Sequence, residues 1–410
     1  MKGQVKPFTH LEHVPRWLIR GLVFSFILGL GSDFIANERP LVVRYEERIF
    51  FPVCRAYLQT WGWLEHHPVM DVRNEHHRQH WMLRPPIVYH YNTLDSHHTN
   101  YVGPFDRQQV PWRERHWLGT DQLGRDTFAG LFAGLRVAWL VGLGAVLLAA
   151  GLGIGLGILA GYFGNRFWKV GLADLVVLSL LIVCSIYLWV IYYPWHVHSL
   201  GHGGQSLKVS WWLLLGGGFI IWIKRTKHWT RRWHVPADTI ILRIIEWLKA
   251  IPGVFLVLTF MGLVDKPTLG SLIFIIGLTA WPTMAQYTRA ELLKVKHQSF
   301  VESVYALGLS HLRIIGVHIF PVILGPLAIT WAFAFSNAIL IESALSFLGL
   351  GLAVDQVSWG SLLNEARQHL PAWWLALFPG LGIFSMVYAF NRLGDAILLA
   401  FQPQENRKPL

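Results

Sequence analysis

The sequence predicts an all-α polytopic membrane protein that crosses the bilayer eight times and carries a long external loop after its first helix. Hydrophobic residues make up 53% of the 410 residues, and charged residues only 14%. An average soluble domain has about 25% charged residues. With a mean hydropathy of +0.39, the chain has too little charge to cover a soluble globule and too much apolar mass to remain disordered.

Eight apolar stretches approach the length of about 20 residues that a helix needs to cross the hydrocarbon core. We place them at residues 17–36, 131–160, 170–193, 209–223, 240–264, 268–287, 322–347 and 373–401. The second stretch carries glycines at four-residue spacing, which let helices approach closely in lipid. They form the rows Gly151/Gly155 and Gly153/Gly157/Gly161. Pro252 lies inside the fifth stretch, where we expect a kink.

Positive charge predicts the orientation of these spans. Lys and Arg concentrate in the N-terminal segment and in alternate short turns, most densely at residues 224–232. Because short cytoplasmic turns hold the excess of Lys and Arg, we expect both termini in the cytoplasm and residues 37–115 outside. The net charge of +11 then reflects topology. No basic run with interleaved aromatics indicates a nucleic-acid partner.

The segment Gln298–Pro321 lies between the sixth and seventh spans and predicts two short helices. By spacing, Glu302, Ala306 and Leu309 fall on one face of the first helix, and Gly308 ends it.

Ser310 can cap the second helix, which we expect over Leu312–Ile319. Pro321 then opens the next span, where a missing N–H costs nothing. A short helix pair that projects from a bilayer suits the docking of a cytosolic partner. A simple re-entry linker is an equally weighted alternative at this point.

A cluster of polar residues and glycines precedes the second span. Its two glycines allow tight turns, and its threonine and first aspartate can cap the following helix. We expect a structural role at the external rim, with contact to a binding protein as the alternative; no nucleophile–base pair is visible. This rim motif consists of Gly119, Thr120, Asp121, Gly124, Arg125 and Asp126.

The long external loop is rich in histidine. The residues are His66, His67, His76, His77, His80, His90, His97 and His98. There is no His-Glu-x-x-His run, and no carboxylate stands at a matching spacing. His76 and His80, four residues apart, could bind zinc if that stretch were helical. We nevertheless expect a solvated loop and no metal site.

Two further residues are candidates for a gate or for the substrate path. Glu342 is a charged residue inside a span, which is costly and often functional. Trp359 lies in the stretch Ser358–Leu363 that follows the seventh span. For Glu342 we favour a structural or gating role over binding of a substrate amine.

Several of these motifs resemble those of ABC-importer permeases. Their coupling loop has a Glu, a Gly six residues later and a distant Pro, matched here by Glu302, Gly308 and Pro321. Ser303 and Val304 depart from the usual Ala-Ala. By resemblance, the residues that contact the ATPase are Glu302, Ser303, Ala306, Leu307, Gly308, Leu309 and Pro321.

Other segments follow in the order of the oligopeptide/dipeptide-type permeases. They are His116–Phe128, Gly161–Arg166, Glu342–Leu352, Ser358–Leu363, Pro371–Gly380 and Phe390–Pro403. Ser32–Pro52 also resembles the second permease of the Yej type, which imports peptides including the antibiotic microcin C.

The resemblance implies a type I permease bundle of six family helices, here with an inserted two-helix hairpin. The expected parts are residues 1–36, the external loop 37–115, the family segment 116–164, the insertion 165–237, the permease core 238–403 with coupling loop 289–321, and the tail 404–410.

The resemblance also implies the partners and the location. They are a homologous second permease, two ATP-binding cassette subunits, a periplasmic substrate-binding protein and a peptide, with the chain in the bacterial inner membrane. The chain has no Gly-x-x-x-x-Gly-Lys-Ser/Thr run, so it is expected to be no enzyme and to hold no cofactor, with ATP-Mg bound by the partners. A secondary transporter or channel without an ATPase is the alternative.

Overall fold

The computed structural model describes residues 15–45, 48–60, 81–165, 169–171, 232–234, 236–264, 267–352 and 356–401. The chain divides into two compact units. The first comprises residues 1–157 and 245–410, and the second residues 158–244. The expected third and fourth spans lie outside the described residues except for Val170 and Gly171, as do the histidines from His66 to His80.

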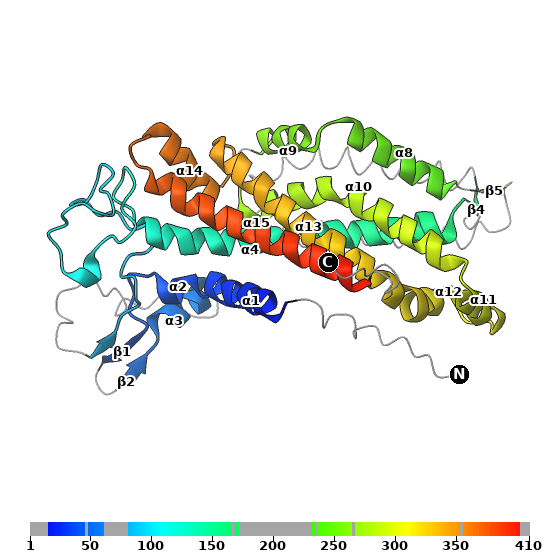
Figure 1. The fold of residues 1–410 in the computed structure, drawn as a ribbon, viewed down its shortest axis with the longest axis horizontal. Helices are drawn as coiled ribbons and strands as arrows, with labels where there is room; N and C mark the ends of the chain where they lie inside the picture. The colour runs from blue at the N-terminus through cyan, green and yellow to red at the C-terminus, as the bar shows by residue number, and fades with distance from the viewer. Residues whose placement is uncertain are drawn as a thin grey trace, which may run out of the picture. The chain divides into compact units, whose positions relative to one another are not determined.

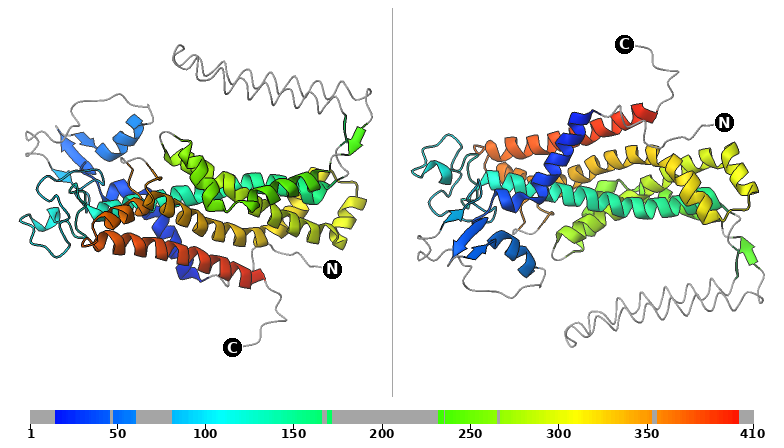
Figure 2. Two further views of the ribbon diagram at one scale, coloured as in Figure 1. Left: turned by 90° about the horizontal axis from the view of Figure 1, so that it is seen from above. Right: turned by 90° about the horizontal axis from the view of Figure 1, so that it is seen from below.

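The first unit is mostly helical, and its long helices run beside one another in all three views (Figures 1 and 2). Its helices are α1 (Arg16–Leu30), α2 (Ser32–Ile35), α3 (Pro52–Thr60), α4 (Thr127–Ile158), α9 (Gly253–Gly262), α10 (Leu269–Lys296), α11 (Ser299–Ala306), α12 (His311–Arg313), α13 (Phe320–Phe347), α14 (Trp359–Gln368) and α15 (Trp374–Phe401). Among the described residues, four helical stretches are long and apolar enough to cross a membrane: Thr127–Phe163, Leu269–Lys296, His311–Phe347 and Trp374–Phe401.

Glycines allow α4 to pack closely against its neighbours. A Cβ on Gly153 would lie 2.4 Å from the Met284 Cβ of α10, and one on Gly157 would lie 2.6 Å from the Thr288 Cβ. Gly151 has no such neighbour. The close packing predicted from the glycine rows is thus confirmed for Gly153 and Gly157, because only that row faces α10.

Aromatic rings join α4, α13 and α15 in the core. The rings of Phe335 and Phe390 stack at 3.7 Å, and Trp139 meets both edge-on at 5.2 and 5.4 Å. Leu18 and Leu22 of α1 are buried in the same cluster. The apolar faces of four helices therefore share one core.

One expected helix boundary was wrong. The fifth stretch is two helices, because α8 (Ala237–Ala250) ends before Pro252 and α9 begins after it. Pro321 lies in the first turn of α13, as expected, although the chain is already helical from His311, with π-helical turns at Ile314–Ile319. The wider π turns, in which Phe320 N–H donates to the Ile315 carbonyl, place the proline's missing N–H where the hydrogen-bond pattern changes.

A small sheet accompanies α2 and α3. Strands β1 (Val42–Tyr45), β2 (Arg48–Phe50) and β3 (Met82–Leu83) pair antiparallel in the order β2-β1-β3. Val43 pairs with Phe50 on one side and with Met82 on the other. β1 is thus the central strand of this sheet.

The described residues of the second unit include a short antiparallel ribbon. Strands β4 (Lys169–Gly171) and β5 (Arg232–His234) pair with Val170 opposite Trp233. In the same unit, Asn165 bonds to Thr239 near the start of α8.

Candidate functional site

The segment Gln298–Pro321, which we call the loop segment, lies at one end of the first unit (Figure 1). Its anchors are buried: Val301 and Ile314 are 0% exposed. Between them the chain projects. Leu307 is 77% exposed and Leu312 is 81% exposed. The segment thus presents two large apolar side chains on a firmly seated turn.

Gly308 allows the reversal between α11 and α12. Its φ is +72°, in the region that glycine adopts at helix C-termini without strain. The predicted break is therefore confirmed.

The predicted single helical face is only partly correct. Glu302 and Ala306 lie on α11 and are exposed, as is Ser303. Leu309 lies three residues beyond the end of that helix, because Gly308 redirects the chain. The second helix begins after Ser310 as expected, but the Ser310 side chain makes no capping bond.

The rim motif lies at the opposite end of the first unit (Figure 1). Gly119 and Gly124 both have φ of +80°, so the predicted tight turns are confirmed. The predicted caps were wrong. Asp126 caps α4 by accepting the Ala129 N–H at 2.7 Å, since the helix begins only at Thr127.

Thr120 and Asp121 instead hold the turn together. The Thr120 hydroxyl donates to the His98 carbonyl at 2.8 Å and accepts the Val102 N–H. Asp121 Oδ1 accepts the backbone N–H of Leu123 and of Arg125, each at 2.8 Å. The motif is therefore held by hydrogen bonds within itself and to the loop that precedes it.

Arg125 connects the rim motif to α14. Its guanidinium binds Asp121 at 2.5 Å and Glu365 at 2.6 Å. Burial and the nearby Asp121 charge raise the pKa of Glu365 to about 7, although Arg125 acts in the opposite direction. Sequence reasoning missed Glu365, because nothing in the sequence places residue 365 beside residue 125.

A second group brings Asp126 together with His116, His98 and Asp95. His116 is 0% exposed and lies between Asp126 and Asp95, with one ring nitrogen 2.8 Å from the Asp126 carboxylate. The histidine spacing in the sequence indicated no carboxylate partner, but Asp95 lies beside these histidines in the structure. It stands three residues before His98, in a turn rather than a helix.

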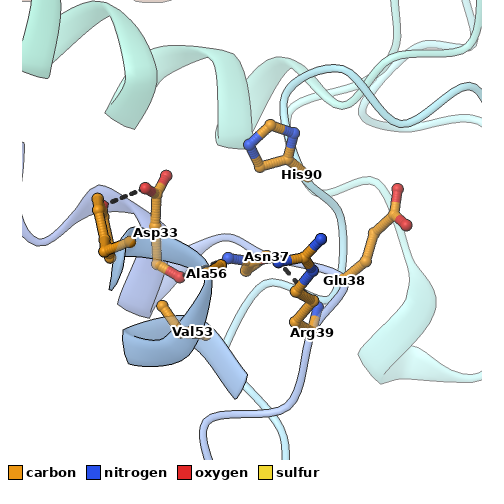
Figure 3. A pocket seen from close by; sticks show the side chains of 8 residues that line it. Asp33, Asn37, Glu38, Arg39, Val53, Ala56 and His90 are labelled. Atoms are coloured by element: carbon orange, nitrogen blue, oxygen red, sulfur yellow. Dashed lines mark hydrogen bonds between the residues drawn. The ribbon is translucent and has the colours of Figure 1, made fainter. Parts of the chain in front are cut away.

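A polar cavity of ≈ 330 Å³ opens beside α2 and α3 (Figure 3). Tyr57 donates to Asp33 on its wall, and Arg136 of α4 binds the same carboxylate at 2.6 Å. Burial and the Asp33 bond raise the pKa of Tyr57 to about 12. These contacts tie α2, α3 and α4 together.

Glu342 and Trp359 are both buried. Ser346 and Ser343 donate to the Glu342 carboxylate at 2.8 and 3.3 Å. The Trp359 indole donates to the Leu131 carbonyl at 3.0 Å and packs where a Cβ on Gly134 would be 2.3 Å away. The Glu342 contacts lie within α13, whereas the Trp359 contacts join α14 to α4. A role in gating stays a prediction.

A larger cavity of ≈ 480 Å³ lies among α4, the α8–α9 break, α10 and α13. Its wall is mostly apolar, with a few polar groups such as Thr279, Thr330 and Asn337. Neither Glu342 nor Trp359 lines it. Sequence reasoning missed this cavity, because its residues come from five separate helices.

The sequence matches one known protein family and several known transport proteins. Residues 226–406 match the family described as binding-protein-dependent transport system inner membrane component. The chain is also 28% identical to the dipeptide transport system permease protein DppC of Bacillus subtilis (strain 168) over 302 residues, 73% of this chain and 72% of that protein.

Two further relatives match different shares of this chain. A putative peptide transport system permease protein of Brucella suis biovar 1 is 35% identical over 173 residues, 42% of this chain and 58% of its own length. The glutathione transport system permease protein GsiD of Pectobacterium atrosepticum is 27% identical over 301 residues, 73% of this chain and 76% of that protein.

The matched residues include both the cavity walls of α9, α10 and α13 and the exposed loop segment. With several apolar helices long enough to span a membrane, the chain is a multi-pass inner-membrane permease subunit of a binding-protein-dependent ABC transporter, a transport component and not an enzyme.

Proposed function

We propose that this permease subunit imports peptides or peptide-like compounds, and that the loop segment is its contact with separate ATPase subunits. The relatives described above are named as permeases for dipeptide, peptide and glutathione transport. The observation that carries the coupling proposal is the exposure of Leu307 and Leu312 on a turn whose base, Val301 and Ile314, is fully buried.

A force applied to the loop segment passes directly into the helix bundle. The base of the turn is continuous with α13, since the chain is helical from His311 to Phe347. A partner that binds the two exposed leucines can therefore move a whole helix along the cavity wall. Alternating access would be a two-state change that nucleotide binding biases.

The complete assembly would contain a homologous second permease, two ATPase subunits and a periplasmic binding protein. A binding-protein-dependent system implies the last two kinds of partner in general. We further propose eight spans, with both termini and the loop segment in the cytoplasm. The Lys- and Arg-rich turns support this orientation.

The subgroup is a finer proposal. The sequence Ser32–Pro52 and the long loop that follows it resemble the Yej type. Uptake of microcin C by a strain that carries only this permease system would support that subgroup. Resistance of that strain would contradict it.

The test is uptake of a labelled dipeptide in a strain that lacks the chromosomal copy and carries plasmid variants. We expect unlabelled peptides, and not free amino acids, to compete. Glu302→Arg should lower uptake at least 10-fold, because it reverses an exposed charge on α11, and Glu302→Gln should have a smaller effect. Glu246 is also exposed, on α8 and away from the loop segment. Glu246→Arg makes the same charge reversal there and serves as the matched control.

The outcomes separate the parts of the proposal. Uptake that peptides do not compete for contradicts the cargo and leaves the permease assignment intact. Normal uptake with Glu302→Arg, and no ATPase subunit recovered with the tagged chain, contradicts the coupling role. That second result would favour a transporter without an ATPase.

A further inference from the structure

Three potential metal ligands meet beside the rim motif, in the part of the chain that the structure describes. They are Asp95, His98 and His116, and one ligand atom from each lies within 4.8 Å of the others. Asp95 Oδ2 is 2.8 Å from His98 Nδ1 and 3.3 Å from His116 Nε2. The latter distance is close to the roughly 3.3 Å expected between two atoms that each lie about 2.0 Å from a tetrahedral zinc ion.

Each ligand is held in its orientation by a separate contact. Asp95 Oδ1 accepts the His97 N–H at 2.9 Å, which leaves Oδ2 directed at the two imidazoles. His116 Nδ1 lies 2.8 Å from Asp126 Oδ2, so Nε2 faces the cluster. A carboxylate behind a histidine is the usual outer support of a zinc ligand, because it sets the tautomer and the ring orientation.

Asp126 and His116 each have a further contact. The other oxygen of Asp126 caps α4 at the Ala129 N–H, and the Tyr89 ring stacks on the His116 imidazole at 4.2 Å. The supporting shell is therefore built from the start of a long helix and a packed aromatic ring.

The charges also favour a cation. In the described ranges, the carboxylates of Asp95 and Asp126 form ion pairs with histidines and with no Lys or Arg. The side chains of Asp95 and His98 are 15% and 11% exposed and that of His116 is 0% exposed. Two acids confined in such a place are balanced by one divalent ion. Two nitrogens and one oxygen form a donor set that zinc accepts.

We propose that Asp95, His98 and His116 bind one zinc ion, with Asp126 as a positioning residue and water at the fourth position. Asp95 and His98 belong to the long loop, and His116 precedes the rim motif. The ion thus fastens the loop to the start of α4.

The test uses the full-length chain purified in detergent and treated with a chelator. Titration with zinc chloride should show one saturable equivalent and raise the melting temperature. Cobalt chloride should give the visible absorption bands of a four-coordinate ion. Asp126→Asn, which keeps the helix cap, should weaken zinc binding by about 10- to 100-fold. His98→Ala and Asp95→Asn should weaken it more.

His97→Ala is the matched control. The His97 side chain is exposed, and only its backbone N–H contacts Asp95, so this variant should bind zinc as the wild type does. A His98→Ala protein that melts normally without zinc, and gains nothing from zinc, shows loss of the ligand rather than of the fold. If His98→Ala does not purify folded, Asp95→Asn decides, because its amide oxygen can still accept the His97 N–H.

Two results would overturn the proposal. One is a wild-type chain with no saturable zinc equivalent, which would leave His116 as an imidazolium between two carboxylates. The other is zinc binding that survives in His98→Ala and Asp95→Asn and disappears when His76 and His80 are replaced.

Discussion

The rim motif and the loop segment lie at opposite ends of the first unit (Figure 1) and are constructed in opposite ways. At the rim, buried polar groups bond to one another: Thr120 and Asp121 are at most 2% exposed, and each has several partners. In the loop segment the buried groups are apolar anchors, and Leu307 and Leu312 extend into the surroundings.

This difference separates motifs that maintain the fold from motifs that can bind a partner. A polar group already satisfied inside the chain gains little from a second protein, because docking would only exchange one hydrogen bond for another. An exposed leucine gains about 2 kcal/mol when a partner covers it. Both motifs resemble those of the same family, but their contacts differ, and the coupling role proposed for the loop segment rests on its exposed leucines.

The largest expected effect is in the loop segment. Leu307→Asp should abolish uptake and recovery of ATPase subunits while leaving the melting temperature within about 1 °C, because the side chain is 77% exposed and fills no core. Uptake and co-purification should be measured on the same preparations.

Leu370→Asp is the matched control. Leu370 is 82% exposed and lies between α14 and α15, at the rim end. The same substitution there should leave ATPase recovery unchanged. If Leu370→Asp removes the ATPase equally, or Leu307→Asp retains it, the contrast between the two ends is lost.

Two glycines with left-handed φ, Gly124 and Gly308, differ in how closely other atoms surround them. A Cβ on Gly124 would lie 2.2 Å from the Asp95 carbonyl oxygen, whereas a Cβ on Gly308 would meet nothing within 4 Å. Gly308→Ala should therefore lower the free energy of unfolding only by the strain of its φ, about 1–2 kcal/mol. Gly124→Ala adds a backbone clash and should cost about 2–5 kcal/mol in total.

Thermal unfolding of both variants in the same detergent measures this difference. Gly124→Ala should also weaken zinc binding, since the clash displaces Asp95. Equal melting temperatures for the two variants would mean that the rim is no more tightly packed than the loop segment.

The smallest effect is a dependence of stability on pH. In the folded chain the Glu365 carboxyl has a raised pKa of about 7, against 4.5 for an unperturbed one. Between these values the unfolded state releases the proton and the folded state keeps it, so this group lowers stability as pH rises from about 4.5 to about 7.

Glu365→Gln should remove that decrease, as seen in melting temperatures recorded between pH 4.5 and 8. Glu302→Gln replaces an exposed carboxyl on α11, at the opposite end of the first unit, and serves as the control variant. Parallel profiles for Glu365→Gln and the wild type would show that Arg125 keeps the carboxylate ionised.

Periodicity and composition were reliable where a feature depends on local chain chemistry. They located the stretches that became α10, α13 and α15, the break at Gly308 and the turns at Gly119 and Gly124. They were unreliable at Pro252, which separates two helices where a kink within one helix was expected. Pro321 lies in the first turn of α13, as expected.

The sequence by itself determined a membrane-embedded helical protein with a motif at each end, because hydropathy and turn chemistry act over a few residues. Only the tertiary structure decided which groups meet. Asp95 contacts His116, Arg125 contacts Glu365, and the cavity wall is formed by residues of five helices. These contacts join residues 21 to 240 positions apart, a separation over which packing of the folded chain, and not local pattern, sets the geometry.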